Sequence, residues 1–177
     1  IRAWAVRLLN DGQQELPPRA YARLQTLAST DPSGLVRLYI ASSLPRFETS
    51  WAYQIANSLV EIETDAMDRV QPKLIWYGIE PHIVPQSASE SPSGDPIALA
   101  LNSKMPLVRR NIARRLTNEI DRPNNLVANL IQQAILSNDR ELTSDILGGM
   151  QAALNGWSEA PQPTNWTEAT NQFAKLK

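Results

Sequence analysis

The chain has 177 residues, of which 42% are hydrophobic and 20% are charged, and its formal net charge is −1. This length suffices for one sizeable domain with a buried core, and the nearly neutral charge argues against binding to nucleic acid or to acidic lipid. No apolar run reaches the roughly 18 residues that predict a membrane span. Because cysteine is absent, the chain holds no disulfide, thiolate metal site, cysteine nucleophile or haem-attachment motif.

Apolar residues recur at helical spacing along most of the chain, and no strand-like alternation interrupts them. The segment 17–30 opens on two prolines, which favour a helix start, and Ser50 is the predicted N-cap of the helix over 50–62. Pro81 should kink or end the strongly apolar helix over 72–84. The predicted helices cover residues 1–9, 17–30, 35–44, 50–62, 72–84, 107–116, 121–137 and 139–156.

The breaks between these helices define the expected organisation. Residues 85–96, rich in proline and serine, predict an exposed loop inside a helical domain over 1–157. Residues 158–177 should form a loop and a C-terminal helix packed on the last repeat, with Asn165 and Glu168 as a capping box. Because Ile1 already lies in a repeated motif, we expect the chain to be a piece of a longer protein.

One ten-residue motif occurs twice. "LVRLYIASSL" (35–44) and "LVRRNIARRL" (107–116) share six of ten letters at a separation of 72 positions, and "IRAWAVRLL" (1–9) is a variant 35 positions before the first. A period near 36 residues built from helices predicts an all-α fold, an α-solenoid of about five stacked helix pairs.

The segment "DPSGLVR" (31–37) resembles the HEAT-repeat signature, with Asp31 six residues before Arg37 and Val36 beside it. The resemblance implies that such Asp and Arg residues form a ladder between adjacent repeats. The second copy keeps Val108 and Arg109, but Ser103 replaces the aspartate. We therefore expect Arg37 to bond Asp31 or nearby loop backbone, and Arg109 to bond another carboxylate, such as Glu80 or Asp139.

A longer series of motifs, "IRAWAVRLL", "LIWYGIEPHI", "PLVRRNIARRL" and "DILGGMQAALNG", resembles the HEAT-type segment of a bacterial family. These are the PVC-type haem-binding proteins, which are also described as membrane-bound dehydrogenases. The resemblance implies a β-propeller before the segment and a cytochrome c domain with a CxxCH motif after it. It also implies export to the periplasm and electron-transfer chemistry, with haem c outside this chain.

The helix over 107–116 carries a basic band of Arg109, Arg110, Arg114 and Arg115. The band is either a partner- or anion-binding site, since arginine binds carboxylate and phosphate bidentately, or a solvated face with salt bridges between repeats.

Two neighbouring segments offer further candidates. Trp76 and Tyr77 form either a stacking platform or a core residue beside a tyrosine whose hydroxyl bonds a polar neighbour. Glu80, in an apolar helix, is either a structural ion-pair partner or a functional acid. His82, the single histidine, is a possible general base but cannot by itself build a zinc site.

The Gly148–Gly149 pair indicates a close approach of two helices.

The residues contain no phosphate loop, nucleophile elbow or metal-ligand cluster, so we predict no catalytic, cofactor-binding or metal-binding residue in this chain. The expected function is a non-catalytic scaffold or protein-interaction segment of a larger chain, with flanking domains or another protein as partners. The alternative is a segment that contributes to an active site or electron-transfer docking face of a haem-containing dehydrogenase.

Overall fold

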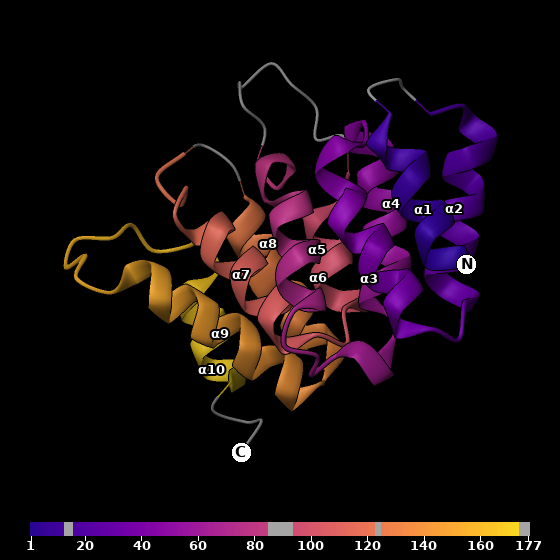
Figure 1. Ribbon diagram of the computed structural model, residues 1–177. Helices are drawn as coiled ribbons and strands as arrows, with labels where there is room; N and C mark the ends of the chain where they lie inside the picture. The colour runs from indigo at the N-terminus through magenta and orange to yellow at the C-terminus, as the bar shows by residue number, and fades with distance from the viewer. Residues whose placement is uncertain (13–15, 85–93, 123–124, 174–177) are drawn as a thin grey trace. The chain divides into compact units, whose positions relative to one another are not determined.

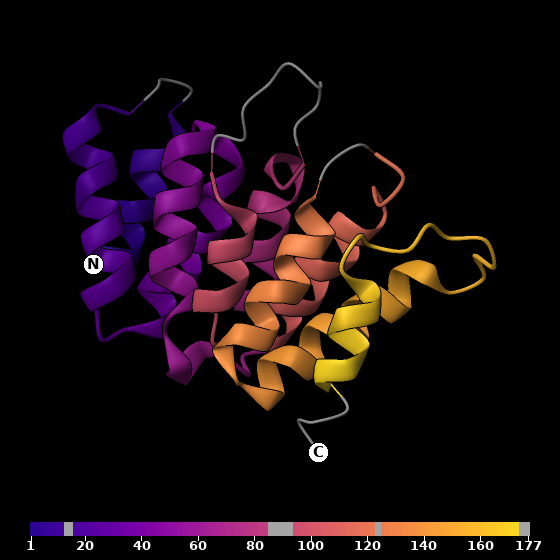
Figure 2. The same cartoon turned by 180° about the vertical axis from the view of Figure 1, so that it is seen from behind.

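A computed structural model describes residues 1–12, 16–84, 94–122 and 125–173, and the fold of these residues is all-helical, without a β-strand. The all-α prediction is therefore confirmed for this part of the chain. The α-helices, drawn in Figures 1 and 2, are α1 (Arg2–Asp11), α2 (Pro18–Thr30), α3 (Gly34–Ser43), α4 (Thr49–Val60), α5 (Gln71–Ile79), α6 (Pro96–Asn102), α7 (Pro106–Thr117), α8 (Leu126–Ser137), α9 (Arg140–Leu154) and α10 (Trp166–Phe173). Short 3₁₀ helices cover Leu44–Arg46, Glu63–Asp65 and Glu80–His82.

The chain divides into two compact units. The first comprises Ile1–Gly94 and Asn102–Val108, and the second comprises Asp95–Leu101 and Arg109–Lys177. The boundary therefore passes through α6 and α7, and each unit is described below by itself.

The first unit contains two rows of helices. In one row α1 packs on α3 and α3 packs on α5, while in the other α2 packs on α4. The rows are joined because α2 contacts α3 and α4 contacts α5. Large apolar side chains that exclude water fill the space between the rows, among them Leu24, Ile40, Leu44, Ile55, Leu59, Ile75 and Ile79.

In the second unit, α8 packs on both α9 and α10. The approach of α9 to α7 depends on Gly149, where a β-carbon would lie 2.2 Å from the backbone oxygen of Arg110 and 2.9 Å from the β-carbon of Ala113. The predicted close helix–helix contact is confirmed at this position. It is wrong for Gly148, where a β-carbon would meet nothing within 4 Å.

Local geometry explains several helix ends, and the end predicted at Pro81 is confirmed. Helix α5 ends at Ile79, and Pro81 lies in the 3₁₀ turn that follows it. Asp139 begins α9 by accepting hydrogen bonds from the backbone N–H groups of Glu141 and Leu142. Gly156 follows the end of α9 with a φ of +84°, a conformation that favours glycine.

Two capping predictions are wrong. Helix α4 begins one residue before Ser50, and the Ser50 hydroxyl donates to the carboxylate of Glu48 (3.1 Å) instead of capping the helix. Asn165 precedes α10, but its amide donates to the backbone oxygen of Ala128 (2.8 Å), so the side chain faces α8 and no capping box forms.

The loop predicted over 85–96 is tested only at its end, because residues 85–93 lie outside the described residues. Pro96 already belongs to α6, a helix that the sequence pattern did not predict. The Asp95 carboxylate accepts from the backbone N–H groups of Ile97 and Ala98 (2.9 and 3.0 Å) and so caps this helix. The helix is only seven residues long, which is too short for a clear helical period.

The adjacent glycines of α9 allow a matched test of packing. Gly149→Ala should lower the free energy of unfolding by about 1–3 kcal/mol, because the added methyl group collides with the backbone of α7. Gly148→Ala should raise it by up to about 1 kcal/mol, because alanine has the higher helix propensity and space is free. Chemical denaturation of both variants measures the difference, and equal stabilities would contradict the close approach.

Candidate functional site

The buried side chain of Arg37 lies at the centre of a polar cluster in the first unit. Its guanidinium forms a bidentate pair with Asp65, in which Nε contacts Oδ2 and Nη2 donates to Oδ1 at 2.7 Å. Nη1 donates to the backbone oxygen of Asp31 at 2.5 Å. One arginine thus binds two turns of the chain, and the predicted contact of Arg37 with loop backbone is confirmed.

The carboxylate of Asp31 has a different partner. It accepts from Arg2, with Nε 2.6 Å from Oδ2 and Nη2 3.1 Å from Oδ1, and from the backbone N–H of Ser33 at 2.9 Å. Asp31 therefore binds Arg2 through its side chain and Arg37 through its backbone. The same arrangement of arginine and carboxylate occurs at Arg2–Asp31 and Arg37–Asp65, at sequence separations of 29 and 28 residues.

Sequence inspection missed two members of this cluster. Asp65 lies six residues before Gln71, as Asp31 lies six residues before Arg37, and the Gln71 side-chain amide donates to Asp65 Oδ2 at 2.7 Å. Gln71 thus takes the position that arginine occupies in the preceding repeat. The spacing of six was the available signal, but glutamine does not match the Asp–Arg motif.

A related pair holds α7 to α9 in the second unit. Arg109 Nη1 lies 3.2 Å from Asp145 Oδ2, and Arg110 Nε donates to Asp145 Oδ1 at 2.9 Å. The observed partner of Arg109 is therefore the carboxylate of Asp145, and not that of Glu80 or Asp139. Asp139 is engaged as the cap of α9. No ion pair of Glu80 is found among the residues that the structure describes.

The remaining arginines of the basic band differ in environment. Arg115 Nη1 lies 2.6 Å from Glu119 Oε1, and Arg122 binds the other oxygen of Glu119 at 2.5 Å. Arg114 is exposed, and within the described ranges no ion pair of its guanidinium is found. Most of the band is thus engaged with carboxylates of its own unit, which favours the salt-bridge interpretation over an anion site.

These contacts lower the pKa of both aspartates of this cluster, Asp31 and Asp65. Hydrogen bonds from Arg37 hold the pKa of Asp65 below its ordinary value, although burial acts in the opposite direction. Hydrogen bonds from Arg2, assisted by the Ser33 N–H, likewise lower the pKa of Asp31. Both carboxylates are ionised at neutral pH and are acceptors that hold the turns in place.

Trp76 and Tyr77 do not form a shared platform. Trp76 is buried, as the core interpretation requires, whereas Tyr77 is 60% exposed. Glu80 is half-buried at the start of the 3₁₀ turn that follows α5.

His82, in the same turn, contacts Thr49 Oγ1 through Nδ1 at 3.0 Å. Its backbone oxygen accepts from the Tyr53 hydroxyl at 3.1 Å. Burial lowers the pKa of His82, so the ring is neutral at pH 7. In the part of the chain that the structure describes, no group of His, Cys, Asp or Glu residues is arranged to hold a metal ion.

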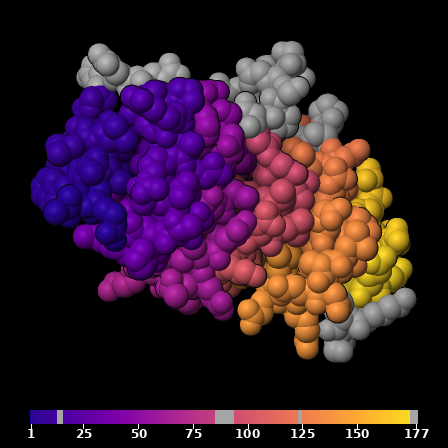
Figure 3. All heavy atoms as spheres, turned by 90° about the vertical axis from the view of Figure 1, so that its right-hand side faces the viewer, coloured from indigo at the N-terminus to yellow at the C-terminus, as the bar shows by residue number. Residues whose placement is uncertain are grey.

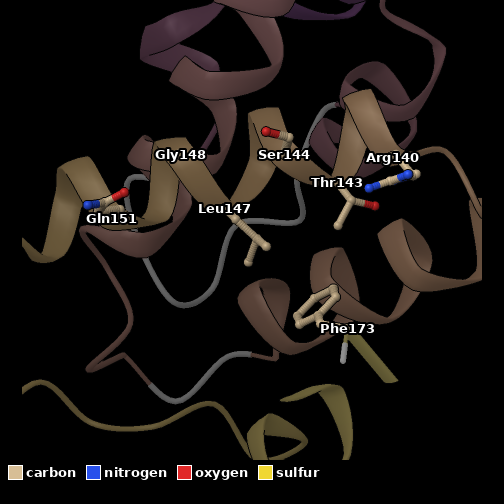
Figure 4. Close-up of a pocket in the computed structure, with 7 residues that line it drawn as sticks. All are labelled: Arg140, Thr143, Ser144, Leu147, Gly148, Gln151 and Phe173. Atoms are coloured by element: carbon tan, nitrogen blue, oxygen red, sulfur yellow. The ribbon is translucent and has the colours of Figure 1, made fainter. Parts of the chain in front are cut away.

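The second unit contains an open pocket of about 400 Å³ beside α9. Figure 4 shows Thr143 and Leu147 extending from α9 towards the ring of Phe173. The Thr143 hydroxyl donates to the backbone oxygen of Asp139 at 2.7 Å. The lining residues are Arg140, Thr143, Ser144, Leu147, Gly148, Gln151 and Phe173.

Comparisons of the chain with protein-family models, with curated proteins and with solved structures find no match. Among the described residues, no helix combines the length and the apolar character needed to cross a membrane.

Arg109 and Arg110 provide a test of the pair with Asp145. The Arg109 side chain is 8% exposed and that of Arg110 is 59% exposed. Arg109→Ala leaves a buried carboxylate with its internal partner removed, so it should cost about 3 kcal/mol or more. Arg110→Ala removes a solvent-screened contact and should cost less than about 1 kcal/mol. Equal melting temperatures of the two variants would refute a structural role for Arg109.

The acidified aspartates predict a pH dependence of stability. In Asp31 and Asp65 the folded-state pKa lies below the ordinary value of 3.8. Their contribution is therefore complete above the unfolded-state pKa and is lost as the pH falls through the folded-state pKa. The melting temperature should fall steeply below about pH 4, and Asp65→Asn should lower it at pH 7 and reduce the acid slope. Exposed Asp121→Asn controls for the loss of one negative charge.

Proposed function

We propose that this chain is a HEAT-like α-solenoid segment that serves as a non-catalytic scaffold or protein-interaction segment of a larger protein. The observation that supports the proposal most directly is the repeated pairing of an arginine with a carboxylate of the following repeat. The residues at the repeat position of Arg37 are Arg2, Arg37, Gln71, Arg109 and Asp145. Successive members of this series are 35, 34, 38 and 36 positions apart.

The chemistry of these residues suits a scaffold better than a catalyst. Arg37, Asp65 and Gln71 hydrogen-bond one another, so their polar groups are occupied in holding successive helices together. A buried guanidinium needs such partners, because an unpaired charge in the interior is strongly unfavourable. What remains for function is the outer surface of the helices, which repeat proteins use to bind or to space other domains.

A scaffold must hold its helices at a fixed spacing. Because cysteine is absent, spin labels can be attached at Arg7→Cys in α1 and Lys73→Cys in α5, both exposed. Since α3 packs on both helices, pulsed electron-spin resonance should give one narrow distance peak near about 20 Å, two interhelical spacings. Adding Asp65→Asn should broaden it. A broad or bimodal distribution in the unsubstituted background would contradict a scaffold.

A catalytic role makes a different prediction. Incubation of the full chain with candidate dehydrogenase substrates and an artificial electron acceptor should give no saturable turnover. Turnover that is lost in His82→Ala or Glu80→Gln, with an unchanged melting temperature, would favour an active-site segment instead. Tyr77→Ala, which alters an exposed residue close by in sequence, is the control for nonspecific effects.

A further inference from the structure

No further inference is drawn: the strongest candidate, the apolar surface patch that α1 (drawn in indigo in Figure 3) exposes through Trp4 and Leu8, carries no proposal because nothing in the structure shows what covers it.

Discussion

The buried guanidinium of Arg37 is the constraint on which the first unit depends. A charged group with so little solvent contact must be matched by hydrogen-bond acceptors, or the folded state loses several kcal/mol of stability. Asp65 and the backbone of Asp31 supply those acceptors. Since Asp31 also binds Arg2, satisfying one charge places the turns before α3 and α5 in register with the start of α1.

The burial of apolar side chains stabilises the helix packing that the polar contacts orient. The stripe of Val36, Ile40 and Leu44 is almost fully buried, and its burial supplies far more favourable free energy than hydrogen bonds exchanged with water. The ion pairs determine which turn contacts which helix, whereas the burial of the apolar stripes determines the stability of the helix packing. Such a division leaves the outer faces of the helices free to differ.

Local sequence signals predicted the helices well where the pattern was long or the end carried a distinct residue. Pro81 and Gly156 mark helix ends through their own backbone conformation, and Asp139 does so through its carboxylate, which accepts from the N–H groups of Glu141 and Leu142. None of these effects needs a distant partner. The errors at Ser50 and Asn165 have a different origin. At Ser50 the competing group is local, because the Glu48 carboxylate lies two residues earlier in the chain. At Asn165 the competing group is the Ala128 carbonyl, 37 residues away, which only the fold brings close.

The sequence by itself determined the helical class and the period near 36 residues, because helix propensity and apolar spacing act within a few turns of the chain. It also marked Arg37 and Arg109 as equivalent. Only the tertiary structure decided which carboxylate each arginine binds: Asp65 for one and Asp145 for the other, at separations of 28 and 36 residues. Over such separations the packing of the helices determines which carboxylate each arginine binds. Several carboxylates have similar local sequence surroundings, and the one that becomes buried beside the arginine is its partner.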